Sequence, residues 1–231
     1  SIMKKYNFYA AIFLISMAGL MLQICHTRLL SVIAWYYLAF FAISVAMLGI
    51  TAGAVLVYLK REQITDNNVP NLLRKLSLTL AATIPLSMLL LFSIITAMTS
   101  SLSSVFSWIL VLCSLALPYF FIGIIISIAL TKTTFSQAKT YAIDLIGAAV
   151  GCLLVVALME IISTPAVVFI IASLCALAAC LLSTTHRLLP LCISVILLLM
   201  GIGNNYVSWG FKPILVKAAL ENSFDQDSGA K

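Results

Sequence analysis

Long apolar runs separated by short polar connections dominate the sequence. Seven runs are long enough to cross the hydrocarbon core of a membrane, which takes about 20 helical residues. They cover residues 6–26, 31–59, 76–98, 105–130, 141–162, 165–184 and 188–205. The strands of a membrane β-barrel would instead alternate apolar and polar positions over about ten residues. The pattern therefore predicts an all-α, polytopic membrane helix bundle of about seven transmembrane helices in contact with the lipid bilayer.

Residues 1–205 are predicted to form one transmembrane domain. The stretch 60–75, KREQITDNNVPNLLRK, is its one substantial loop. Pro85 and Pro118 lie inside predicted helices and should kink them, whereas Pro165 suits a first helical turn. Residues 206–231 change in composition and are predicted to form an interfacial or disordered tail, in which Trp209 suits the membrane interface.

Charge indicates how the helices are oriented. The chain has 13 Lys and Arg against 7 Asp and Glu, a net charge of +6, 63% hydrophobic residues and a mean hydropathy of +1.18. The basic residues flank apolar runs, so they indicate membrane orientation and not a nucleic-acid partner. A cytoplasmic N-terminus places most of them inside, which the positive-inside rule favours, and seven spans then place the C-terminus outside. The residues on the inner side are Lys4, Lys5, Lys60, Arg61, Arg74, Lys75, Lys132, Lys139 and Arg187.

Asp144 is the first candidate functional residue, because it lies about one turn into the span 141–162. An ionisable side chain within a membrane is costly unless it is paired or faces a polar interior. Tyr141, three residues earlier, lies on the same helix face. Two interpretations are open: Asp144 caps the first turn, where the helix dipole favours a negative charge, or it is a buried carboxylate that binds a cation or moves a proton.

Two glycine pairs have the GxxxG spacing that lets membrane helices approach closely. Gly49 and Gly53 lie in the second span, and Gly147 and Gly151 lie in the fifth. The pairs either serve helix packing alone or hold a polar cleft between the second and fifth helices.

A polar cluster, QICHTRLLS, lies between the first two predicted spans and contains Gln23, His26 and Arg28. Gln23 and His26 are three residues apart and can share a helix face. A lone histidine at a helix end is more often solvated or hydrogen-bonded than a ligand. The two histidines are far apart and the cysteines are not interleaved with them, so no metal site is predicted. The chain has no phosphate-binding glycine loop, nucleophile elbow or HExxH motif, so no catalytic residue and no cofactor are predicted.

Three stretches within roughly residues 10–160 together resemble the membrane portion of bacterial membrane-bound spermidine-synthase-like proteins. The first is MAGLMLQICHTRLLS followed by MLGITAGAVLVYLKR, the second is LPYFFIG, and the third is YAIDLIGAAVGCLL, which is similar to the family's YAADLLGAALGALL. The positions that match are Arg28, Gly49, Gly53, Pro118, Gly123, Tyr141, Asp144, Gly147 and Gly151. Two positions depart from the family pattern: Gln23 stands where a glutamate is expected, and His26 where a tryptophan is expected.

In that family, several helices precede a soluble aminopropyltransferase-like or methyltransferase-like domain. The resemblance implies a multi-pass protein of the bacterial inner (plasma) membrane that anchors such a domain, with any enzymatic activity outside this chain. It also implies that Asp144 is the counter-charge for a small cationic amine. Tyr141, Arg28, Gln23 and His26 are further candidate binding residues. The alternatives are a small cation or amine transporter and a scaffold subunit of a larger membrane complex.

Overall fold

The computed structural model describes residues 5–33, 38–65, 68–97, 104–183 and 187–206. These residues form seven α-helices, all long and apolar enough to span a membrane, so the predicted fold class is confirmed. The helices are α1 (Lys5–Ile33), α2 (Leu38–Leu59), α3 (Val69–Ala97), α4 (Ser104–Thr131), α5 (Gln137–Ile161), α6 (Thr164–Leu182) and α7 (Leu188–Tyr206).

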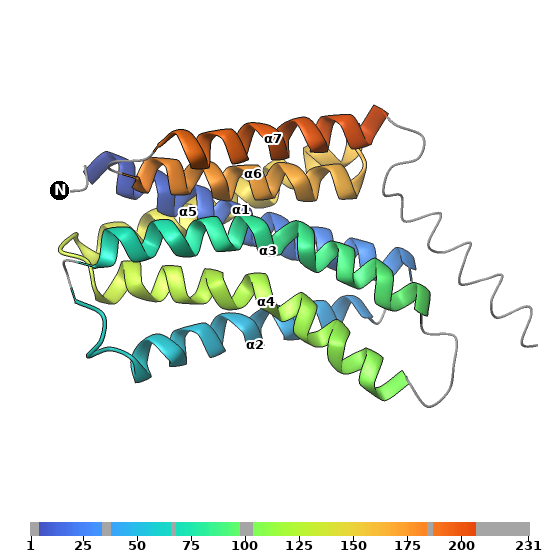
Figure 1. Cartoon of the computed structure of the whole chain (residues 1–231), viewed down its shortest axis with the longest axis horizontal. Coiled ribbons are helices and arrows are strands. Elements are labelled where there is room, and N and C mark those ends of the chain that lie inside the picture. The colour runs from blue at the N-terminus through green and yellow to red at the C-terminus, as the bar shows by residue number, and fades with distance from the viewer. Residues whose placement is uncertain (1–4, 34–37, 66–67, 98–103, 184–186, 207–231) are drawn as a thin grey trace, which may run out of the picture.

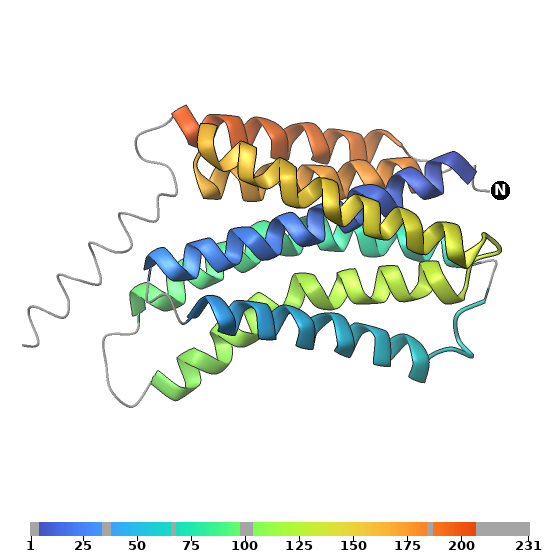
Figure 2. The same cartoon turned by 180° about the vertical axis from the view of Figure 1, so that it is seen from behind.

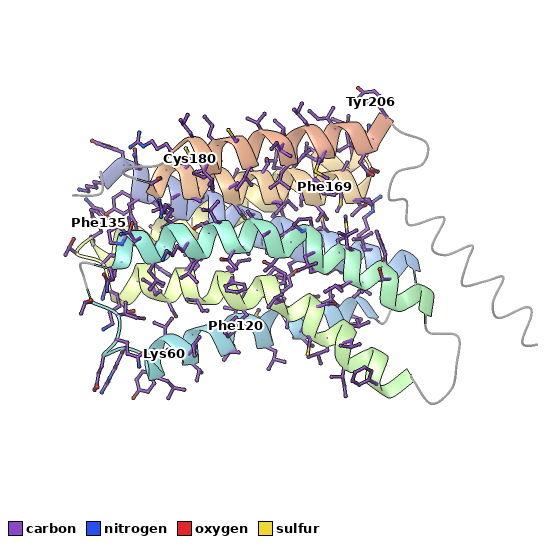
Figure 3. All side chains as sticks on the ribbon, viewed as in Figure 1. Lys60, Phe120, Phe135, Phe169, Cys180 and Tyr206 are labelled. Atoms are coloured by element: carbon purple, nitrogen blue, oxygen red, sulfur yellow. The ribbon has the colours of Figure 1, made fainter. Side chains whose placement is uncertain are left out.

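Successive helices alternate in direction, so the start of α1, the ends of α2, α4 and α6 and the starts of α3, α5 and α7 share one end of the bundle (Figure 1). We call it the basic end, and Figure 3 shows Lys60 and Phe135 there. Its described basic residues are Lys5, Lys60, Arg61, Arg74, Lys75, Lys132, Lys139 and Arg187. The fold thus gathers on one side the charges from which the orientation is predicted.

Helix α1 is the centre of the bundle. It packs against α2, α4, α5 and α6, and α5 lies along it in the view of Figure 2. Its side chains Phe8, Ile12, Ile15 and Leu22 are completely buried. Helix α3 packs between α4 and α6, whereas α7 packs against α6 at the edge. The apolar core therefore surrounds α1, and α5 and α7 present mostly apolar outer faces to the bilayer.

Glycines bring the backbones of α2 and α4 into direct contact. A Cβ atom built on Gly53 would lie 2.3 Å from the carbonyl oxygen of Phe120, and one on Gly123 would lie 2.3 Å from that of Ile50. A Cβ on Gly49 would lie 2.7 Å from the carbonyl oxygen of Ala116. No larger side chain fits at such separations, so these three glycines define the α2–α4 contact.

The second glycine pair faces a different partner. A Cβ on Gly147 would lie 2.7 Å from the carbonyl oxygen of Phe13, and one on Gly151 would lie 2.5 Å from that of Met17, so α5 packs closely on α1. The two pairs therefore do not form a cleft between the second and fifth helices. That interpretation is wrong because Gly49 and Gly53 pack against the backbone of α4, and Gly147 and Gly151 pack against that of α1.

The first two helices differ from the prediction in their ends. Helix α1 continues to Ile33 and α2 begins at Leu38, whereas 26 and 31 were expected. Gln23, His26 and Arg28 consequently lie within α1 and not between two spans. Residues 34–37, AWYY, carry no charge, so no charged residue marks where α1 ends.

The structure also shows where the prolines and Arg74 lie in their helices. Pro165 lies in the first turn of α6, as predicted. Helix α4 contains Pro118 and bends along its length (Figure 1), as a proline inside a helix should cause. Helix α3 begins at Val69, so Arg74 belongs to the helix and not to the preceding loop. Trp209 and the rest of the predicted tail after Tyr206 lie outside the described residues.

Replacing Gly53 by valine should destabilise the bundle by at least about 1–3 kcal/mol, the usual cost of overpacking, because the new side chain would meet the α4 backbone. Thermal unfolding in detergent measures the loss. The matched control is Gly203→Val, since a Cβ there meets nothing within 4 Å. Equal unfolding midpoints for the two variants would show that the α2–α4 contact does not require glycine.

A topology experiment tests the predicted orientation. With seven spans and the basic end in the cytoplasm, alkaline phosphatase fused after Lys231 should be active, and a green fluorescent protein fused there should be dark. Fusions within the α2–α3 connection at Gln63 serve as the opposite control and should give the reverse result. Fluorescence from the Lys231 fusion would contradict the predicted orientation or the number of spans.

Candidate functional site

The first polar pair inside the bundle joins α5 to α1. The hydroxyl of Ser16 donates a hydrogen bond to Oδ1 of Asp144, with an oxygen-to-oxygen distance of 2.5 Å. Ser16 is buried, and Asp144 is half-buried. Asp144 is seven residues after the start of α5, which places it about 10 Å into the helix from the basic end. The pair therefore lies two turns inside α5, although Asp144 is only one turn inside the predicted span 141–162.

The pair lies beside the glycine contact between α1 and α5. Gly147 lies one turn after Asp144, and the backbone that it meets belongs to Phe13, one turn before Ser16. Because the two backbones touch there, the short serine side chain reaches the carboxylate of the neighbouring helix. The residue types alone do not predict this pairing, since the two positions are 128 residues apart.

Asp144 does not cap α5. The N-cap residue is Ser136, the first turn contains no acidic residue, and no side chain caps the helix. The capping interpretation is therefore wrong, because the helix begins at Gln137, earlier than the predicted span. Among the described residues, the carboxylate accepts a hydrogen bond from a neutral hydroxyl and has no basic partner within salt-bridge distance.

The other predicted binding residues do not gather around Asp144. Tyr141 is 54% exposed on the outer side of α5, one turn nearer the basic end. Gln23 is half-buried in α1, about 10 Å along that helix from Ser16, and Arg28 is exposed about 18 Å along it. Tyr141 therefore lies one turn from Asp144 on the same helix, whereas Gln23, His26 and Arg28 lie toward the opposite end of the bundle.

A second polar pair, between His26 and Tyr119, joins α1 to α4. Nδ1 of His26 lies 2.8 Å from the hydroxyl oxygen of Tyr119, and the rings meet edge to face with centroids 5.7 Å apart. Both side chains are 1% exposed. The sequence did not predict this pair, because the residues are 93 positions apart and no sequence pattern links one to the other.

The other ring nitrogen of His26 is unusual. Nε2 is buried and has no hydrogen-bond partner among the described residues, whichever nitrogen carries the proton. An unsatisfied buried polar group costs about 1–3 kcal/mol. The described residues contain no group of three or more His, Cys, Asp and Glu side chains placed to hold a metal ion. His26 therefore acts through Tyr119 as a polar link between α1 and α4.

No protein-family model, curated protein or solved structure matches this chain. The structure establishes a polytopic helical membrane protein. Its function has to be inferred from the two polar pairs and from the charge distribution described above.

Replacing Tyr119 by phenylalanine should lower the free energy of unfolding by about 1–3 kcal/mol, because Nδ1 of His26 then loses its buried partner. The double variant His26→Leu/Tyr119→Phe should lose less than the sum of the two single variants, since both remove the same hydrogen bond. Chemical unfolding in detergent micelles measures all three. Strict additivity would show that the two side chains do not stabilise each other.

Proposed function

We propose that this chain is a helical membrane module that binds a small organic cation at Asp144 and anchors a soluble catalytic domain. The resemblance to the membrane portion of spermidine-synthase-like proteins supports the anchoring role. The observation that carries the binding role is the Asp144 carboxylate, which lies two turns inside α5 against Ser16 without a basic partner among the described residues.

The chemistry around Asp144 suits an ammonium group. An ionised carboxylate has two acceptor oxygens, and Ser16 uses one of the lone pairs on Oδ1. A hydrogen bond between an ammonium donor and a carboxylate is about twice as strong as one between neutral groups. The exposed ring of Tyr141, one turn away, offers a cation–π surface to a cation that approaches along the outer side of α5.

A bound cation would also remove an energetic cost. Asp144 lies within a helix that is long and apolar enough to span a membrane, and an unpaired charge inside such a span is unfavourable by several kcal/mol. The large apolar outer face of α5 leaves Asp144 partly open, so a cation can reach it without displacing a helix. In this proposal the residue is a binding group and not a catalytic one.

The geometry supports binding better than transport. Secondary transporters usually bind their substrates at discontinuous helices near the middle of the membrane. Here each of the seven described helices is continuous, and the core around α1 is almost entirely apolar. A scaffold subunit needs only an apolar outer surface that a partner can contact. The exposed faces of α5 and α7 are apolar, but contact with lipid explains them equally well.

Replacing Asp144 by asparagine should weaken the binding of spermidine about 10- to 100-fold, which is the range for losing a hydrogen bond to a charged group. The asparagine keeps the acceptor for Ser16, so the unfolding midpoint should stay close to that of the wild type. Isothermal titration calorimetry of the protein in uncharged nanodiscs, at constant ionic strength, measures the affinity. Glu160→Gln is the matched control, because Glu160 is an exposed carboxylate at the other end of α5.

Two results would contradict the proposed cation site. One is an Asp144→Asn protein that folds normally and binds spermidine as the wild type does. The other is an equal loss of affinity in Glu160→Gln, which would show that any carboxylate on α5 attracts the amine.

A further inference from the structure

The basic end carries a second feature that is independent of Asp144. This end has eight described basic residues, which lie in the helices or in the connections between them. Its loops contain one described acidic residue, Glu62. Two of the connections are tied together, because Nζ of Lys132 donates a hydrogen bond of 2.6 Å to the carbonyl oxygen of Arg61. This hydrogen bond holds the α2–α3 connection, with its basic residues Lys60 and Arg61, next to Lys132 at the end of α4.

Arg74 differs from the other arginines of this end. Nε of Arg187 donates to the carbonyl oxygen of Ser183 at 2.9 Å, and the guanidinium of Arg61 lies over the ring of Tyr58 at 5.4 Å. Nε of Arg74 is buried and has no hydrogen-bond partner among the described residues. Arg74 as a whole is half-buried, and its terminal N–H groups have no hydrogen-bond partner in the described part of the chain, so these donors are free to meet an acceptor from outside.

The depth of Arg74 indicates the kind of acceptor. Arg74 lies five residues after the start of α3, about 8 Å into a helix that is apolar enough to span the membrane. Lys75 follows it and is exposed. Basic side chains at this level meet the phosphates of the lipid headgroups, and arginine is suited to bind two phosphate oxygens at once.

We infer that Arg74, together with Lys75, binds the phosphate of an anionic lipid headgroup at the basic end of the bundle. The phosphate oxygens accept hydrogen bonds from the terminal N–H groups of the half-buried Arg74 and from the exposed ammonium group of Lys75. The surrounding basic residues strengthen the attraction through their summed charge, and Arg74 gives it a defined position.

The experiment compares lipids on the full chain in uncharged detergent micelles. Added phosphatidylglycerol should raise the unfolding midpoint and remain bound in native mass spectra, whereas phosphatidylcholine and inorganic phosphate should do neither. Arg74→Gln should weaken the apparent affinity for phosphatidylglycerol about fivefold, which corresponds to the contribution of one basic side chain near an anionic surface. Arg74→Lys should retain part of that affinity, because it keeps the charge but loses the paired donors.

Arg28→Gln is the matched control, since Arg28 is an exposed arginine near the other end of the bundle. It should leave the affinity for phosphatidylglycerol unchanged. Unchanged affinity in a folded Arg74→Gln protein, or an equal loss in Arg28→Gln, would overturn the assignment of the site to Arg74. Stabilisation by inorganic phosphate alone would overturn the assignment to a lipid. None of these outcomes bears on spermidine binding at Asp144.

Discussion

Direct contact between helix backbones at glycine positions is the constraint on which this bundle depends. In a bilayer the lipid tails are as apolar as the side chains, so the hydrophobic effect contributes little to the association of helices. Close packing has to supply the attraction, and it requires residues without a side chain at the contact. Gly53 with Gly123 provides this for α2 and α4, and Gly147 with Gly151 provides it for α5 on α1.

The same contact determines where the polar chemistry lies. Because Gly147 meets the backbone of Phe13, α5 is fixed in both height and rotation against α1, and the carboxylate of Asp144 meets the hydroxyl of Ser16. Helix α1 also carries His26, which links it to α4 at a different depth. One central helix thus holds both polar pairs, and its residues in these pairs, Ser16 and His26, are both buried.

The sequence predicts the seven helices because apolar length alone decides whether a segment can span a bilayer. It does not predict the end of α1, since the polar residues His26 and Arg28 lie inside the helix and no charged residue marks its end at Ile33. A GxxxG pair indicates that one face of a helix has small residues, but it does not indicate which helix packs there. The helices that pack on Gly49 and Gly147 are therefore known only from the structure. The His26 and Tyr119 pair depends on tertiary contact alone. The structure also excludes Asp144 as a helix cap, because α5 begins at Gln137, four residues before the predicted apolar run.

Backbone contact along α1 and α5 leaves no passage between these two helices. Under the proposed function, a cation that approaches Asp144 from the aqueous side at the basic end meets the eight positive charges there, which repel it over about 10 Å at 0.1 M ionic strength. Added salt screens this repulsion and raises the association rate, whereas it weakens the bound pair and raises the dissociation rate. The two rates thus respond to salt in the same direction, which makes residence time, more than affinity, the property that ionic strength controls at this site.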